Sequence, residues 1–378
     1  MPSKSSPAAL VWLRKDLRLA HNPALQAAIK TGCPLILLYI LEDEEAGLRP
    51  MGAASKWWLD KSLQALSQSI EARGGRLSLR AGSARSVLSD ILKEVEIGHV
   101  FWNRRYGAAE RDIDETLKTW LKSENIAVES FNGALLTEPW TIKTGQGGYY
   151  KVFTPYWRAL QARYTSPPLY KAPEKLSGPS LASETLSDWS LHPHAPDWSI
   201  DFTQMWTPGE ASAHIKLHNF LSGPVSAYSE DRNRPDKTDG TSGLSPHLAF
   251  GEISPAQVWQ ATMARIETGE INSNSATVFL SEIAWREFSY VLLYHNPDMA
   301  RQNYNSDFKY MDWREEKHDY HLWCTGQTGY PMVDAAMRQL WRTGWMHNRA
   351  RMIVASFLTK HLLLPWQWGE AWFHDTLV

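Results

Sequence analysis

The chain has few cysteines and no long apolar run. Its two cysteines, Cys33 and Cys324, form no CxxC pair and cannot build a disulfide framework, which fits a reducing compartment. No run of about 18 apolar residues is present that could span a membrane, and the first residues, MPSKSSPAA, lack the charged-then-apolar pattern of a secretion signal. The sequence therefore predicts a soluble, cytoplasmic protein with no membrane partner, and we expect it to be a monomer.

Motifs for metals, serine nucleophiles and the common nucleotide folds are also missing. No HExxH, His/Cys tetrad or GxSxG elbow occurs, and His192 and His194 lie in a proline-rich stretch. No GxGxxG follows the first predicted strand, and TGQGGYYK at Thr144–Lys151 lacks Walker A spacing. We therefore predict no metal site and disfavour the Rossmann dinucleotide and P-loop interpretations.

Positive charge and aromatic rings are concentrated in one stretch, although the formal net charge of the whole chain is only -2. No carboxylate occurs between Asp334 and Glu370, and part of the chain's 19 tryptophans falls there. Such a stretch suits a ligand with phosphates and flat rings, a nucleotide cofactor or nucleic acid. A solvated basic face on a helix pair would leave the same pattern. The residues concerned are Arg338, Trp341, Arg342, Trp345, His347, Arg349, Arg351, Lys360, Trp366 and Trp368.

The first 135 residues alternate short β-rich apolar runs with helical periodicities, which predicts a doubly wound α/β domain with a parallel sheet. The predicted strands are Ala9–Leu13, Leu35–Leu41, Arg76–Arg80, His99–Trp102 and Ile126–Phe131. The predicted helices are Pro23–Lys30, Ser55–Glu71, Ala84–Glu94 and Ala108–Lys122.

Helical patterns dominate the rest of the chain after a linker rich in proline and serine. We expect three regions: an α/β domain at 1–135, a linker at 136–207 and an all-α domain at 208–378. Ser254 and Gln257 form a capping box that opens a helix reaching Gly269. Further helices are predicted at Ser275–His295, Tyr330–Trp341 and Trp345–Leu364.

Three strings resemble the DNA photolyase/cryptochrome family of blue-light flavoproteins. TGYPMVDAAMRQL at Thr328–Leu340 and TGWMHNRARMIVASFL at Thr343–Leu358 match the family hallmark, and VWLRKDLRLAHNPAL at Val11–Leu25 matches its opening segment. The resemblance runs from Leu10 to Val378 and is nearest to bacterial cyclobutane pyrimidine dimer photolyases of the class I/III type. It implies an α/β domain followed by an all-α domain that binds FAD without a covalent bond.

The segment DGTSGLS at Asp239–Ser245 resembles the family's TSxLSP segment, which holds the FAD pyrophosphate. From the residues alone, its hydroxyls and free amides also suit an ordinary capped turn. The family usually has a bulkier residue than Gly243 and a tryptophan at the position of Phe279. The FAD contacts implied by the resemblance are Tyr228, Thr241, Ser242, Gly243, Leu244, Ser245, Phe279, Glu282, Arg286, Asn348 and Arg351.

A second family block, FLSEIAWREFS at Phe279–Ser289, places Glu282 and Trp285 on one helix face. An amphipathic helix with a local ion pair would look the same. In the family, the matching glutamate hydrogen-bonds a damaged base and the matching tryptophan stacks on it. The resemblance implies Glu282, Asn348 and Met352 as catalytic residues, and Arg232, Trp285, Arg349 and Met352 as contacts to DNA. Asn348 with Met352 favours cyclobutane dimers, because six-four photolyases have a histidine at the position of Asn348.

Two further groups of residues are implied by the resemblance. Trp313 and Trp366 match two members of the family's electron-transfer chain, and Trp341 offers a branch, unless it only packs in the core. Glu110 matches a glutamate that holds an antenna pterin, and Trp57 matches an aromatic near the antenna in one subgroup. A folate-type antenna, methenyltetrahydrofolate, is therefore expected, with an ordinary interface aromatic as the alternative for Trp57.

The function implied is light-driven repair of pyrimidine dimers in damaged DNA, as a deoxyribodipyrimidine photo-lyase. In the family, light-excited reduced flavin donates one electron to the dimer, two bonds open and the electron returns. A cryptochrome-type light sensor and an inactive fragment with weak flavin binding are the alternatives. The last residues, WFHDTLV, fall within an apolar helical pattern without a glycine cap, so we expect a C-terminally truncated photolyase that binds FAD poorly.

Overall fold

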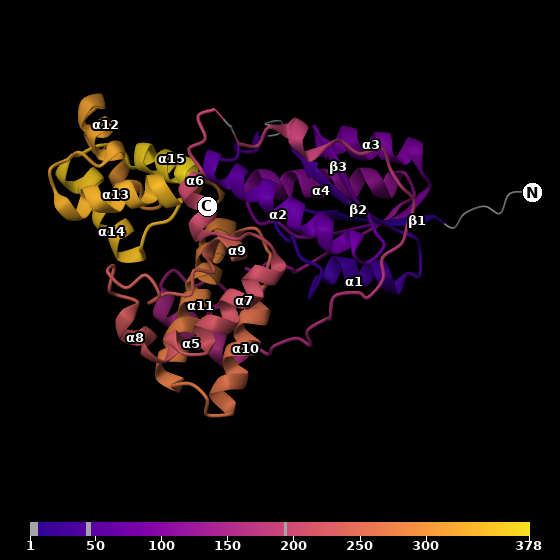
Figure 1. Ribbon diagram of the computed structural model, residues 1–378, viewed down its shortest axis with the longest axis horizontal. Coiled ribbons are helices and arrows are strands. Elements are labelled where there is room, and N and C mark those ends of the chain that lie inside the picture. Colours follow the sequence, from indigo (N-terminus) through magenta and orange to yellow (C-terminus); the bar gives the residue numbers. More distant parts are fainter. Residues whose placement is uncertain (1–6, 43–46, 193–194) are drawn as a thin grey trace, which may run out of the picture.

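The structure is a computed structural model that describes residues 7–42, 47–192 and 195–378 (Figure 1). Residues 1–6, the first part of the N-terminal segment MPSKSSPAA, and His194 lie outside the described residues. The N-terminal part holds five parallel strands in the order β3-β2-β1-β4-β5. The strands are β1 Ala8–Leu13, β2 Leu35–Leu41, β3 Leu77–Ala81, β4 Ile97–Asn103 and β5 Ala127–Phe131. The helices between them are α1 Pro23–Lys30, α2 Ala53–Glu71, α3 Ala84–Glu94 and α4 Ala108–Ser123.

The predicted doubly wound α/β fold is confirmed, and the sequence explains its elements. All six residues of β1 are buried, as expected for a strand covered by helices on both faces. Helix α1 starts after Asn22, whose side chain accepts a hydrogen bond from the Leu25 amide, with Pro23 at the first helical position. Ser83 caps α3 in the same manner.

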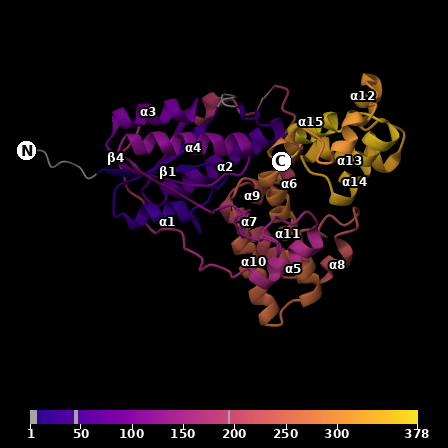
Figure 2. The same ribbon diagram turned by 180° about the vertical axis from the view of Figure 1, so that it is seen from behind.

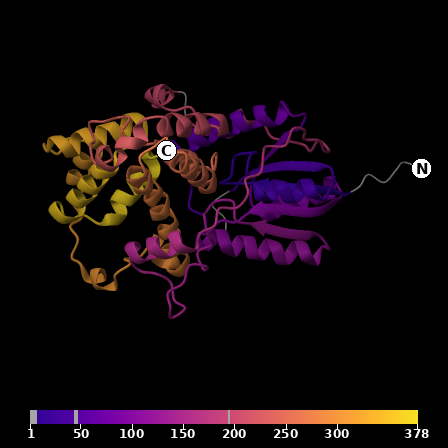
Figure 3. The same ribbon diagram turned by 90° about the horizontal axis from the view of Figure 1, so that it is seen from below.

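Helices account for the second part of the molecule. They are α5 Phe153–Arg163, α6 Ile200–Met205, α7 Glu210–Leu221, α8 Tyr228–Asp231, α9 Ser245–Ala249, α10 Pro255–Glu267, α11 Ser273–His295, α12 Lys317–Thr325, α13 Pro331–Thr343, α14 Asn348–Ser356 and α15 Trp366–Thr376. Short 3₁₀ turns occur at Leu186–Trp189, Pro224–Ala227, Pro297–Ala300 and Ser306–Tyr310, and a π-helical turn at Phe357–His361. This part lies beside the sheet rather than over one of its faces (Figure 3).

Two segments differ from expectation. Helix α5 lies within the expected linker, and its Tyr156 and Leu160 are buried in the same apolar cluster as Phe288 of α11. The helix expected at Trp345–Leu364 begins only at Asn348, because the His347 side chain accepts from the Arg349 amide as an N-cap. It then widens into the π-helical turn and ends before α15.

The two parts share a core. Trp58 of α2 donates from its indole Nε1 to Glu252 Oε1 at 3.0 Å, and Glu252 Oε2 also bonds His247 Nδ1. All three side chains are buried. At the first residue of α2, α15 lies alongside (Figure 2), and the Ala53 amide donates to Asp375 at 2.9 Å. Among the described residues, no helix has the length and apolar character needed to cross a membrane.

Candidate functional site

Polar side chains from α8, α11 and α14 meet at one junction. Arg232, at the end of α8, forms an ion pair with Glu282 of α11 at 2.7 Å. The next residue, Asn233, accepts from two guanidinium nitrogens of Arg349 on α14 at 2.6 and 2.9 Å. Arg349 also lies 3.5 Å from the sulfur of Met352, which is 57% exposed. The structure therefore brings Arg232, Glu282, Arg349 and Met352 together, with Asn348 exposed at the start of the same helix.

Trp285, one turn after Glu282, presents an aromatic face beside this junction. Its indole is 44% exposed, so part of a large aromatic ring faces solvent. Phe153 of α5 covers one face, with ring centroids 3.7 Å apart and planes 10° from parallel. The sequence-based prediction missed Phe153, because α5 was assigned to the linker. The VFTPYW string, with apolar residues at helical spacing, was the available signal.

Tyr228 and Phe279 lie in a buried aromatic cluster instead of on an open surface. Both rings contact Phe220, and they contact each other edge-to-face at 5.6 Å. Burial raises the pKa of Tyr228 to about 12, and the nearby carboxylate of Glu282 adds to the shift. These two residues form a base for the junction, since the Arg232 guanidinium lies 5.6 Å from the Tyr228 ring.

The Thr241–Ser245 segment leads into α9, with Leu244 buried and Ser245 exposed. Gly243 has φ +61°, a left-handed conformation that favours glycine. A Cβ on Gly243 would lie 3.2 Å from Nζ of Lys216 on the neighbouring helix α7 (Figure 1). Lys216 was not among the predicted site residues, since nothing in the sequence relates position 216 to position 243.

Arg351 of α14 and Lys216 of α7 are two cations that no carboxylate pairs with in the described residues. The Nε of Arg351 donates to the Met346 carbonyl at 2.9 Å, and burial lowers the pKa of Arg351 to about 10. Across the described ranges, no ion pair is formed by Lys216 or Arg351. Desolvated cations without counter-ions favour an anionic ligand. The donor set therefore fits FAD, whose pyrophosphate is anionic.

Arg286, another predicted FAD contact, is bonded to the protein backbone. Its guanidinium donates to the carbonyls of Ala134 at 2.7 Å and Leu248 at 3.3 Å. It also lines a cavity of about 330 Å³ together with Glu110. Its visible role is thus to tie α11 to the segment after β5 and to α9.

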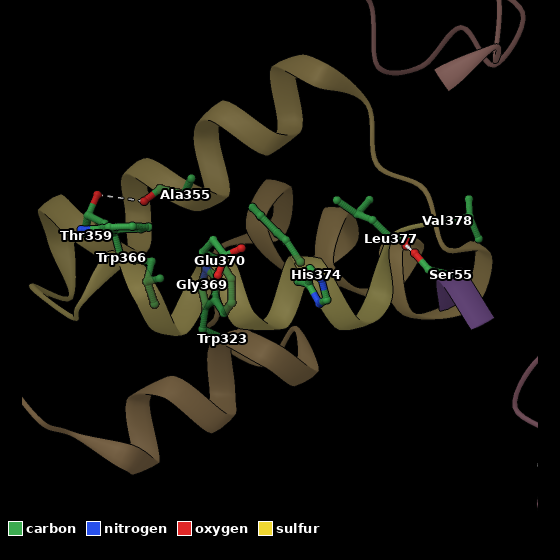
Figure 4. A pocket seen from close by; sticks show the side chains of 12 residues that line it. Ser55, Trp323, Ala355, Thr359, Trp366, Gly369, Glu370, His374, Leu377 and Val378 are labelled. Atoms are coloured by element: carbon green, nitrogen blue, oxygen red, sulfur yellow. Dashed lines mark hydrogen bonds between the residues drawn. The ribbon is translucent and has the colours of Figure 1, made fainter. Parts of the chain in front are cut away.

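The predicted electron-transfer residues separate into two places. Trp313 and Trp366 line one cavity of about 500 Å³, and the Trp366 indole donates to Asn303 Oδ1 at 2.5 Å. Trp366 also lines an apolar cavity of about 530 Å³ between α14 and α15, together with Trp323 (Figure 4). Trp341 is exposed and stacks on Trp372, with centroids 5.8 Å apart and planes 11° from parallel.

The structure does not bring the two predicted antenna residues together. Glu110 lies in the 330 Å³ cavity, where burial opposes ionisation but Lys15, 3.1 Å away, and Arg105 lower its pKa to about 2. Trp57 is 1% exposed and packs edge-on against Trp58 and Phe202 in the main core. A core tryptophan of this kind has no face free for a ligand, so Trp57 does not fit the predicted antenna contact. In the part of the chain that the structure describes, no cluster of three His, Cys, Asp or Glu side chains could hold a metal ion.

Comparisons with known proteins match this chain to one family. A family profile described as DNA photolyase matches residues 9–175, and one described as the FAD binding domain of DNA photolyase matches residues 279–378. A deoxyribodipyrimidine photo-lyase of Agrobacterium fabrum is 48% identical, over 100% of this chain and 78% of that protein. Cryptochrome-1 of Arabidopsis thaliana is 34% identical, over 99% of this chain and 56% of that protein.

Among solved structures, a bacterial class III photolyase from Agrobacterium tumefaciens has a TM-score of 0.95 at 47% identity, covering 100% of this chain and 78% of that one. Identity at this level over the whole chain, together with the two matched profiles, confirms the resemblance seen in the sequence motifs. The chain therefore belongs to the DNA photolyase/cryptochrome family.

Proposed function

We propose that this chain is a deoxyribodipyrimidine photo-lyase, which binds FAD and uses light to split cyclobutane pyrimidine dimers in damaged DNA. The observation that carries the proposal is the junction of α8, α11 and α14, where Glu282, Arg349 and Met352 are linked through Arg232 and Asn233. Beside it lies the half-exposed ring of Trp285. Carboxylate, cation and free aromatic face together suit two linked, extruded bases of one strand with their phosphates.

When bound in its reduced form, FAD supplies one electron under illumination, as the family implies. The chain's own residues bind, orient and exclude water. The carboxylate of Glu282, held by Arg232, is positioned to accept hydrogen bonds from the flipped dimer. Trp285 offers its uncovered face for stacking, and Arg349 offers charge to the DNA backbone. We propose that FAD is bound by the Thr241–Ser245 segment, Asn348 and Arg351. Tyr228 and Phe279 would support this site from the buried side.

Two further assignments belong to this proposal. The cavity at Glu110 is also lined by Lys15, Arg104, Arg105 and Arg286, each of which is paired with a carboxylate. We propose this cavity as the place of a folate-type antenna. Trp313 and Trp366, which border one cavity, would form the chain that carries electrons to FAD. We propose that the protein acts as a monomer in the cytoplasm.

The test is direct repair. The protein is loaded with FAD, reduced without oxygen and illuminated with an oligonucleotide that contains one thymine dimer, and dimer loss is followed by chromatography. We expect repair in light and none in the dark. Glu282→Gln, which keeps the shape of the side chain, should bind the oligonucleotide but repair it more slowly.

The runner-up is a cryptochrome-type light sensor, favoured by the 34% identity to Cryptochrome-1 over nearly the whole chain. A sensor would bind FAD and respond to light, and the dimer would persist although reduced FAD is present. A chain that retains no FAD at all would instead support the inactive fragment.

A further inference from the structure

Lys216 occupies the space that a side chain at position 243 would fill. A Cβ on Gly243 would meet Nζ at 3.2 Å and Cδ at 3.4 Å of this lysine. The ammonium is held in place by Trp206, whose ring centroid lies 5.0 Å away. Trp206 is itself fixed in the core, where its indole donates to the Thr343 carbonyl at 2.7 Å. The lysine is therefore directed at the Thr241–Ser245 segment by rigid surroundings.

The charge of Lys216 has no anionic partner in the described parts of the chain. Its ammonium forms no ion pair there, and burial lowers its pKa without any contribution from a neighbouring charge. Taking an ammonium partly out of water costs free energy that an ion pair or hydrogen bonds normally offset. The cation–π contact with Trp206 offsets only part of that cost. Binding of an anionic ligand at Lys216 would therefore be favourable.

The surroundings identify the kind of anion. Thr241 and Ser242 come just before Gly243 in the chain and Ser245 follows it, so the segment that the ammonium approaches carries three hydroxyl groups. Three hydroxyls and one ammonium suit a phosphate, which offers several acceptor oxygens. Glycine at 243 leaves room for both the lysine and the ligand, and its φ of +61° disfavours any larger residue.

We propose that Lys216 binds the pyrophosphate of FAD and supplies, from α7, the charge and bulk that Gly243 lacks. The inference rests on the proposed function, because it takes FAD to be the ligand of the Thr241–Ser245 segment. It adds a cofactor-binding residue from a helix that none of the family motifs covers.

The test compares three variants of the whole chain. Lys216→Met removes the charge at similar length, Lys216→Arg keeps it, and Lys122→Met removes the charge of an exposed lysine on α4 as the control. The dissociation constant for FAD is measured by flavin fluorescence at low and high salt, with ADP as a competing probe that carries the same pyrophosphate. Thermal unfolding is measured without ligand.

We expect Lys216→Met to weaken FAD and ADP by about 10- to 100-fold, since a hydrogen bond to a charged group is lost. The salt dependence of binding should shrink, and ligand-free stability should be equal or higher because an unpaired, half-buried charge is gone. Lys216→Arg and Lys122→Met should bind FAD within about two-fold of the unchanged chain.

Unchanged FAD affinity in Lys216→Met would overturn the inference. So would a fall in ligand-free stability that accounts for the weaker binding, because Lys216 would then be structural. Loss of DNA affinity with FAD affinity intact would make it a DNA contact and also overturn the inference. If the unchanged chain bound no FAD, the proposed function would fail first, which separates the two results.

Discussion

The indole of Trp285 has one covered and one uncovered face, because the Phe153 ring lies parallel to it at 3.7 Å. Phe153 is held in turn by Phe288, whose ring contacts both partners edge-on. A ring supported in this manner keeps its orientation before a ligand arrives, so little conformational entropy is lost when a base stacks on it. The neighbouring Glu282 is similarly held by Arg232.

We expect Trp285→Ala to lose the preference for dimer-containing DNA, since stacking of a base on an aromatic ring contributes about 1–3 kcal/mol. Phe153→Leu should lose a smaller part of this preference, because the Trp285 ring remains but is less well oriented. The measurement is the ratio of dissociation constants for an oligonucleotide with and without a thymine dimer.

Arg349→Ala is the contrasting variant. Its guanidinium is expected to contact phosphate, so its loss should weaken damaged and undamaged DNA alike and reduce the salt slope by about one. An unchanged ratio in Trp285→Ala would show that the lesion does not bind at this ring.

At the scale of elements, the sequence predicted the α/β part almost completely. The strand at Leu35–Leu41 and the helices at Pro23–Lys30 and Ala84–Glu94 have the predicted bounds, because caps and buried apolar runs are local signals. Helix α5 was missed because its first residues follow a turn-rich stretch and its stability depends on contacts with α11. Such contacts between distant segments leave no periodic signal in the sequence.

The site was predictable where a motif names the residue. Arg232, Glu282, Arg349 and Met352 meet in space, although which residue pairs with which does not follow from the motifs. The partnership of Lys216 with Gly243 depends on the packing of α7, and the burial of Trp57 depends on α6 covering α2. Both are tertiary effects that a pattern along the chain cannot report.

Helix α11 is tied to the segment after β5 by a buried carboxylate. Glu287 Oε2 accepts from the amides of Leu136 at 2.8 Å and Thr137 at 3.3 Å. Burial raises the pKa of Glu287 to about 8, and the neighbouring Arg286, 3.7 Å away, only partly opposes that shift. The folded state therefore holds a proton on Glu287 over a pH range in which the unfolded state has lost it.

A raised pKa sets the sign of the pH effect. Protonation of Glu287 contributes stability that is fully present below its ordinary pKa of 4.5 and is lost as the pH rises through about 8. We predict that Glu287→Gln, which keeps the acceptor but cannot ionise, becomes progressively more stable relative to the unchanged chain from about pH 5 to about pH 9. Urea unfolding across this range measures the difference, with Glu129→Gln on β5 as an exposed control. A constant difference would rule out titration of Glu287 as the cause.

At the scale of the whole molecule, the α/β part and the helical part are joined through buried polar contacts as well as apolar ones. One carboxylate oxygen of Glu252 accepts a hydrogen bond from the Trp58 indole, and the other is bonded to His247. His247 follows the Thr241–Ser245 segment by two residues, so the proposed cofactor segment is attached to the sheet domain through this cluster. Helix α15, which carries Trp366, is attached to the same helix α2 through Asp375. A displacement of α2 would therefore affect both the Thr241–Ser245 segment, which we propose to bind the FAD pyrophosphate, and helix α15 with Trp366.

Trp58→Phe tests this connection between the two parts. The variant keeps an aromatic ring but removes the Nε1 donor, so Glu252 loses a hydrogen bond at a position without access to water. We expect a loss of about 1–3 kcal/mol in the free energy of unfolding, seen in both parts of the molecule, and weaker FAD binding. Trp120→Phe is the matched control, because the half-buried Trp120 indole makes the same bond to Glu124, also at 3.0 Å, but that bond is exposed to water. Its cost should stay within about 0.5 kcal/mol.

Hydrogen exchange followed by mass spectrometry reports the two parts separately. If Trp58→Phe loosened only α2, or cost no more than Trp120→Phe, the buried cluster would not couple the sheet domain to the cofactor segment.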